Sequence, residues 1–181
     1  LIGGQPRQTL PSMPSAASVA LTELQGVGSQ QTVSPAGDVN GDGLRDMLIG
    51  DPLASSSHVY VVFGHRPETA YPMPFNLLTA ADLSFVEPVG VIMSLGVSLA
   101  PMGDLDHDGK DDFAFGEAAP TSGAAIVLSG RLPWELDLPL NWAAYTMLGT
   151  TAADGVGEYL SSGDVNGDML RDLLVGVPAP T

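Results

Sequence analysis

The sequence has no cysteine, so no disulfide bond can hold the fold together. It also has few basic residues: 6 Lys and Arg stand against 21 Asp and Glu, which gives a net charge of −15. Nucleic acids and anionic membrane surfaces are bound through basic patches, so we expect neither as a partner. No apolar run is long enough to cross a bilayer, and no signal peptide begins at Leu1, so no membrane insertion is expected.

Turn-forming residues are abundant, with 22 Gly and 15 Pro, and this composition argues against long helices. Hydrophobic residues make up 44% of the chain, which is enough for a substantial core. The composition therefore predicts many short elements joined by turns, and the excess of acidic residues suits a partner that is a cation.

One acidic motif occurs three times, as GDVNGDGLRD, GDLDHDGKDD and GDVNGDMLRD. Counted from the first Asp, each copy has oxygen donors at positions 1, 3, 5 and 9, and the backbone carbonyl at position 7 can supply a further ligand. Calcium takes about six to eight oxygen ligands, whereas magnesium prefers to keep several waters. We therefore predict three calcium loops, at 38–46, 104–112 and 164–172, with these ligands: Asp38, Asn40, Asp42, Leu44, Asp46; Asp104, Asp106, Asp108, Lys110, Asp112; Asp164, Asn166, Asp168, Leu170, Asp172.

The surroundings of the motif differ from those of an EF-hand. That loop needs a Glu at position 12 and a helix after it, but position 12 here is Ile49, Phe115 or Val175. A short apolar run ending in Gly follows each copy, which indicates a buried strand. Each loop is therefore expected to join two strands.

The third copy differs at position 6, where a sharp turn favours glycine. The first two copies have Gly43 and Gly109, but the third has Met169. A left-handed backbone costs a residue with a side chain about 1 kcal/mol. The third site is expected to be weaker or differently shaped.

The plain alternative is that Asp, Asn and Gly simply favour turns. Three copies in the same phase argue against it, and so does the charge. Positions 1, 3, 5 and 9 of the three loops carry −3, −4 and −3, which is −10 of the net −15. About three calcium ions per chain would offset more than half of that charge.

The repeat is larger than the loop, because the first Asp residues of successive copies are 66 and 60 residues apart. Each unit has a Gly-containing strand before the loop and an apolar strand after it. A second apolar strand is expected at 58–64 and 124–130, and a weaker fourth strand near 83–90 and 142–149. Four short antiparallel strands per unit predict an all-β chain built of β-propeller blades.

This pattern resembles the FG-GAP repeat family, found in integrin α subunits and in bacterial surface proteins. Residues 95–130 carry the resemblance, with matching stretches at 27–64 and 156–178. Departures from the family pattern are mild: its Phe-Gly pair is Val27-Gly28, Leu95-Gly96 and Val156-Gly157 here, and its Gly-Ala-Pro is Gly50-Asp51-Pro52, Gly116-Glu117-Ala118 and Gly176-Val177-Pro178. The resemblance implies calcium between the first two strands of a blade, and a role in adhesion or recognition.

The repeat boundaries predict about three blade equivalents. Residues 1–25 are expected to be the second half of a blade, 26–90 and 91–149 whole blades, and 150–181 the first half of a blade. Propellers typically need about four to eight blades to close. We expect either that further blades of a longer chain complete the object, or that copies of the chain complete one another head to tail into a ring or filament.

An enzymatic role is not expected. The sequence lacks the serine-hydrolase elbow, the Walker loop and the zinc-protease motif. The histidines are interpreted as structural: His107 as a solvated loop residue, and His58 and His65 as strand-end residues. Trp134, Trp142 and Tyr145 are interpreted as core residues of the fourth strand, with a sugar-stacking face as the alternative.

The function expected from the sequence is that of a calcium-stabilised structural or adhesive segment, located outside the cell or at its surface. Its possible partners include an extracellular protein or a glycan. Two alternatives remain open: a carbohydrate-binding propeller and an accessory propeller domain of a larger secreted enzyme. Millimolar extracellular calcium suits loops of modest affinity.

Overall fold

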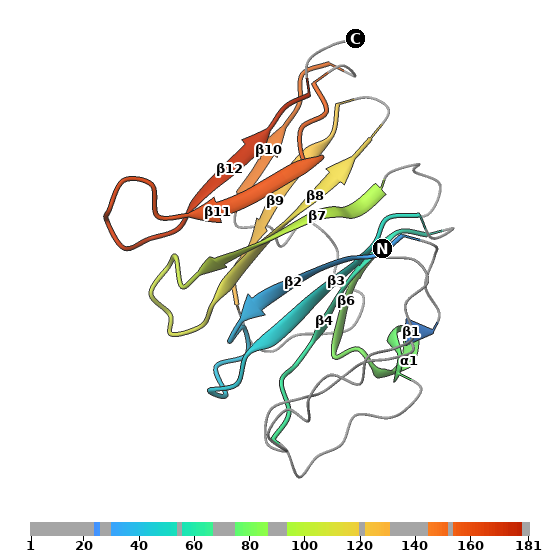
Figure 1. The fold of residues 1–181 in the computed structure, drawn as a ribbon, viewed down its shortest axis with the longest axis vertical. Helices are drawn as coiled ribbons and strands as arrows, with labels where there is room; N and C mark the ends of the chain where they lie inside the picture. Colours follow the sequence, from blue (N-terminus) through green and yellow to red (C-terminus); the bar gives the residue numbers. More distant parts are fainter. Residues whose placement is uncertain are drawn as a thin grey trace, which may run out of the picture.

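The computed structural model describes residues 24–25, 30–53, 56–66, 75–86, 94–119, 122–130, 145–151 and 154–178. These residues form short strands and one short helix (Figure 1). The prediction of an all-β chain with four-stranded antiparallel sheets is confirmed. Within the described segments, no helix has the length and apolar character that crossing a membrane requires.

The first sheet has the strand order β2-β3-β4-β6 and all its pairings are antiparallel. The loop at 38–45 joins its first two strands, as the sequence predicts. The second apolar run and the weak fourth strand both form. The strands are β2 (Thr32–Gly37), β3 (Asp46–Asp51), β4 (His58–Val62) and β6 (Leu83–Val86).

The second sheet repeats this arrangement with the order β7-β8-β9-β10, again antiparallel. A third pair of strands forms an antiparallel hairpin beside it. The strands are β7 (Ser94–Gly103), β8 (Asp112–Ala118), β9 (Ala124–Leu128), β10 (Tyr145–Leu148), β11 (Tyr159–Gly163) and β12 (Asp172–Gly176).

Three small elements lie outside these sheets. The strands β1 (Leu24–Gln25) and β5 (Phe75–Asn76) pair in parallel, and α1 (Leu77–Ala80) follows β5 directly. The Asn76 side chain caps α1 by accepting a hydrogen bond from the Leu78 N–H at 3.0 Å. Phe75 and Leu77 pack with Ile49, so they cover the face of the first sheet that points away from the second. This helix was not predicted from the sequence.

Two apolar interfaces hold the three sheets side by side. The larger interface contains Phe85 of the first sheet and Phe113 and Phe115 of the second, with ring centroids 5.6–6.4 Å apart. The second sheet meets the β11–β12 hairpin through smaller residues, with Leu160 and Leu173 packed against Ala100, Met102, Ala114 and Val127. Burial of apolar surface between neighbouring sheets thus stabilises the array.

A repeated glycine contact sets the close approach of neighbouring sheets. Gly50 lies against the carbonyl oxygen of Gly96, and Gly116 lies in the same way against that of Gly157. A hydroxyl donates to each of these carbonyls: Thr32 Oγ1 to Gly96 O at 2.5 Å, and Ser98 Oγ to Gly157 O at 2.6 Å. Any side chain at the buried glycine would overlap this backbone oxygen.

We predict that Gly50→Ala destabilises the protein by about 1–3 kcal/mol, because a methyl group there displaces the Gly96 backbone. Urea unfolding measures the change. Gly163→Ala is the matched control, since no atom of the described residues lies within 4 Å of a Cβ placed there and its φ is not positive. Equal stability losses in the two variants would contradict this packing.

Candidate cation sites

The three acidic loops project from the same end of the three neighbouring sheets (Figure 1). Each joins the first two strands of its unit: β2 to β3, β7 to β8, and β11 to β12. The strands fix the two ends of every loop, so the loops extend beyond the ends of the packed strands.

The first Asp of each loop organises the backbone that follows it. Asp38 Oδ1 accepts hydrogen bonds from the N–H groups of Gly41 and Asp42, and its Oδ2 accepts one from Gly43 at 2.8 Å. Asp104 accepts equivalent bonds from Asp108 and Gly109. The third loop repeats the pattern through Asp164 Oδ1, which accepts from Gly167 and Asp168, and Oδ2, which accepts from Met169. Contacts within five residues therefore define the loop shape.

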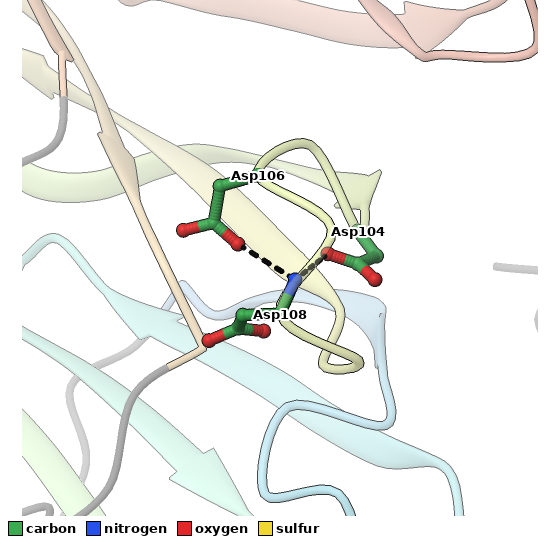
Figure 2. A group of neighbouring side chains, drawn as sticks. All are labelled: Asp104, Asp106 and Asp108. Carbon is green, nitrogen blue, oxygen red and sulfur yellow. Dashed lines mark hydrogen bonds between the residues drawn. The ribbon is translucent and has the colours of Figure 1, made fainter.

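The second loop brings three carboxylates together. Asp104, Asp106 and Asp108 each place one oxygen within 4.8 Å of the others (Figure 2). The Asp108 N–H donates to Asp104 Oδ1 at 3.0 Å and to Asp106 Oδ1 at 3.2 Å, so both side chains turn toward the loop interior. Asp106 also accepts a hydrogen bond from Ser129 Oγ at 2.7 Å.

These donors fit a hard divalent cation. Carboxylate oxygens are the ligands that calcium and magnesium prefer, and three adjacent carboxylates repel one another without a counter-charge. In the first and third loops, position 3 is an asparagine. Asn40 Nδ2 donates to the Asp42 carboxylate, and Asn40 Oδ1 accepts from the Asp42 N–H. Asn166 makes the same two bonds with Asp168. One carboxylate fewer makes these two loops less negative than the second.

Position 9 has a different role in the structure from positions 1, 3 and 5. Asp46 is 3% exposed, and its two oxygens accept hydrogen bonds from the N–H groups of Val39 and Gly64, both at 2.8 Å. Asp112 accepts in the same way from Leu105 and Gly130. These residues therefore tie the first and second loops to the segments that follow β4 and β9, and Asp112 is not part of the three-carboxylate group. In the third loop, Asp172 is half-buried and accepts from the Val165 N–H at 2.9 Å.

Burial raises the pKa of the Asp46 carboxyl to about 6, although hydrogen bonds from Gly64 and Val39 oppose the shift. Burial likewise raises the pKa of Asp112. Because the folded-state pKa of Asp46 exceeds the unfolded value of 3.8, its contribution to stability falls as the pH rises from about 4 to about 6. A nearby cation would favour the ionised form and offset this cost.

Two loop positions adopt left-handed backbone geometry, and the sequence analysis identified only one of them. At position 6, φ is 86° for Gly43, 88° for Gly109 and 72° for Met169. Position 4 is also left-handed, with φ of 77° for Gly41, 61° for His107 and 83° for Gly167. Glycine at position 4 in two of the three copies was the available indication. His107 is exposed, in agreement with its interpretation as a loop residue.

We predict that Met169→Gly stabilises the protein by about 1 kcal/mol, because it relieves left-handed strain at a side chain that is 91% exposed. Thermal unfolding measures the gain. Gly43→Met, the reverse change at the same position of the first loop, is expected to lose a similar amount. A stability loss for Met169→Gly would show that the Met169 side chain makes a contribution larger than the strain.

Position 8 supplies a contact that the sequence analysis missed. Arg45 and Arg171 occupy it in the first and third loops, but Asp111 occupies it in the second. Asp111 binds the backbone of the first loop: the Asp38 N–H donates to Asp111 Oδ2 at 2.8 Å, and the Asp111 N–H donates to Asp38 O at 2.8 Å. An acidic residue where the other copies have arginine was the one indication in the sequence.

The interpretation of Tyr145 as a core residue is wrong. Tyr145 lies on β10, the outer strand of the second sheet, and is 70% exposed. Nothing in the described segments covers this strand's side chains, which are all exposed. Trp134 and Trp142, the other two aromatic residues of that interpretation, lie outside the described residues.

His58 has structural contacts, as expected. Its Nδ1 lies 2.7 Å from the Ser56 carbonyl oxygen, and its ring stacks on Tyr60 with centroids 5.2 Å apart.

The predicted half blade at 1–25 lies outside the described residues, except for Leu24 and Gln25.

Comparison with known proteins finds integrin alpha chains. The chain is 30% identical over 147 residues to integrin alpha-PS5 of Drosophila melanogaster, which is 79% of this chain and 14% of that protein. It is 38% identical over 96 residues to human integrin alpha-IIb, or 48% of this chain and 8% of that protein. Integrin alpha-7 of Rattus norvegicus is 30% identical over 151 residues, or 80% of this chain and 12% of that protein.

No family model matches the sequence. The chain spans between 8% and 14% of the length of these three integrin chains, so the similarity concerns one region of them. That similarity covers most of the chain, and the strand order within each sheet agrees with the repeat that the sequence predicts. The chain is therefore an integrin-alpha-like FG-GAP repeat region.

Proposed function

We propose that this chain is a calcium-stabilised blade segment of an extracellular adhesion protein, with one ion in each acidic loop. The observation that carries the proposal is the set of three neighbouring carboxylates in the second loop, with the same backbone pattern in the other two. Integrin alpha chains are adhesion receptors, and the repeats they share with this chain bind divalent cations, which supports both parts of the proposal.

Within each loop, the side chains at positions 1, 3, 5 and 9 and the carbonyl at position 7 would hold the ion, and in the first two loops position 9 also braces the loop through its backbone hydrogen bonds. The ion supplies positive charge where three or four carboxylates converge. Because a formed site exists only when the flanking strands pair, the free energy of ion binding adds to the free energy of folding.

Native mass spectrometry of the full chain with added calcium tests the proposed binding. We expect about three ions per chain, with the third bound last because of Met169. Asp108→Ala removes position 5 of the second loop and should lower the number of ions by one. No calcium-dependent mass increase at millimolar calcium would overturn the proposed cation sites.

The proposal also assigns a partner to the outer face of the β11–β12 hairpin: another FG-GAP sheet. Leu174 at loop position 11 is 46% exposed, whereas its equivalents Leu48 and Ala114 are each 0% exposed beneath a following sheet. Gly176 corresponds to Gly50 and Gly116, the two glycines that receive a backbone carbonyl of the following sheet. The hairpin thus presents the same packing elements as the two sheets before it.

The sheet that covers this face could belong to a second copy of the chain or to a longer chain, and both would present the same apolar surface. Analytical ultracentrifugation in calcium distinguishes the two by measuring the oligomeric state. Head-to-tail association of this chain that Leu174→Asp abolishes would favour the second copy. Met147→Asp, an exposed change on β10, is the control and should leave association intact. A protein that stays monomeric over a wide concentration range favours further sheets of a longer chain.

The adhesive part of the proposal is tested by solid-phase binding of the calcium-loaded chain to purified fibronectin, laminin and collagen, beside a glycan array. Binding to a matrix protein that a chelator reverses would support it. A positive glycan array with blank matrix proteins would favour the carbohydrate-binding alternative instead.

A further inference from the structure

The first and second acidic loops contact each other through a reciprocal pair of hydrogen bonds between Asp38 and Asp111. The Asp111 carboxylate accepts from the Asp38 N–H, and the Asp111 N–H donates to the Asp38 carbonyl, both at 2.8 Å. Gly37 makes room for this contact, since a Cβ there would overlap the Asp111 carboxylate. The loops therefore share a braced backbone, although Asp38 and Asp111 are 73 residues apart in sequence.

Both partners of this contact are central to their own loops. Asp38 is position 1 of the first loop, and its side chain holds the N–H groups of Gly41, Asp42 and Gly43. Asp111 stands between Lys110 at position 7, whose carbonyl is a predicted ligand, and Asp112 at position 9. A change that orders the second loop therefore also restrains Asp38, the residue that shapes the first loop.

A second contact, between Lys110 and Gly41, also joins the first and second loops. The aliphatic stem of Lys110 lies over the first loop, with its Cγ 3.3 Å from where a Cβ on Gly41 would stand. Residues at positions 7 and 8 of the second loop therefore both rest on the first. The Asp111 carboxylate also adds a fourth negative charge beside a loop whose own ligand set carries three.

We propose that Asp111 couples the cation sites of the first and second loops, so that an ion in either loop raises the affinity of the other. This inference rests on the proposed cation binding. An ion in one loop orders the shared backbone, so the second ion pays a smaller conformational cost. Two divalent ions repel each other, and the Asp111 carboxylate offsets part of that repulsion. The coupling is reciprocal, as linkage requires.

The contact between the second and third loops serves as an internal comparison. Position 8 of the third loop is Arg171, and its Cδ and Nε lie 3.7 Å and 3.8 Å from where a Cβ on Gly103 would stand. A cationic side chain there brings positive charge toward the second loop and provides no carboxylate for its backbone. The coupling between these two loops should accordingly be weaker.

A double-mutant cycle on the full chain tests the proposal, with calcium titrated into each protein. The amide resonance of Gly43 reports ion binding in the first loop, and that of Gly109 reports the second. Asp108→Ala disables the second site, Asp111→Ala removes the bridge, and a third protein carries both changes. Arg171→Ala is the matched control at the same loop position.

In the otherwise unchanged chain, Asp108→Ala should weaken calcium binding to the first loop by about fivefold or more. In the Asp111→Ala background the same change should leave that affinity unaltered, and Arg171→Ala should preserve the fivefold effect. An equal loss with and without Asp111, or no loss in either, would overturn the coupling while leaving calcium binding intact. A Gly43 resonance that ignores calcium in every protein would refute the cation site itself.

If Asp111→Ala does not fold, Asp111→Asn replaces it in the cycle. Asparagine keeps an acceptor for the Asp38 N–H but removes the charge, so the coupling should shrink. Undiminished coupling in that variant would overturn the role assigned to the carboxylate.

Discussion

Removing calcium with a chelator is expected to lower the midpoint of thermal unfolding by at least roughly 10 °C. A ligand present at a hundredfold excess over its Kd stabilises by about 2.7 kcal/mol for each site, and proteins of this size shift by about 2–4 °C per kcal/mol. Three sites acting together would exceed this threshold. Without the ions, the clustered carboxylates also repel one another, which adds to the loss.

Circular dichroism melting of the same sample, with calcium, with chelator and with calcium restored, measures the change. Magnesium should restore only part of the midpoint, because it retains its waters more firmly. Asp42→Ala, which removes position 5 of the first loop, should reproduce part of the fall in calcium. An unchanged midpoint after chelation would mean that the loops hold their shape through hydrogen bonds alone.

Phe115→Ala is expected to cost about 3–5 kcal/mol, the range for removing a fully buried aromatic side chain. Phe115 is 0% exposed, and its ring centroid lies 5.6 Å from that of Phe85 on the first sheet and 6.4 Å from that of Phe113. The cavity would open between the two four-stranded sheets, so it should weaken their packing and not only one strand. Residual stability is expected to be low enough to lower the yield of folded protein.

Chemical unfolding in calcium measures the cost, with intensities of folded amide resonances as the check on yield. Leu148→Ala is the control, because Leu148 is 67% exposed on β10 and its loss should change stability by less than about 0.5 kcal/mol. Similar values for the two variants would argue that the interface between the two sheets contributes little to folding.

The acidic loops were predictable because their shape is local. The carboxylates of Asp38 and its equivalents bond to N–H groups at most five residues away, so the spacing of donors along the sequence contains most of the geometry. The strands on either side were predictable for a similar reason. Apolar runs bounded by Gly and Pro indicate buried strands wherever they occur.

Other features depend on contacts between residues far apart in the sequence, and no local sequence pattern predicts them. Position 9 of the motif stays a predicted ligand, but the hydrogen bond that Asp46 accepts from Gly64 across the sheet was not predicted. The contact of Asp111 with Asp38 requires two neighbouring units to lie side by side. Tyr145 looked like a core residue because aromatic residues suit strands, but burial depends on what covers the strand.

The amino-acid order alone was sufficient for the repeat, the three loops and the four-strand units, since each depends on contacts within one unit. Tertiary packing decided which strand faces are buried, where a glycine must receive a neighbouring carbonyl, and which loops touch. Those outcomes arise from the close approach of whole sheets, in which Gly50 and Gly116 allow backbones to meet. Such contacts are set by packing between units, and the repeat pattern of a single unit does not contain them.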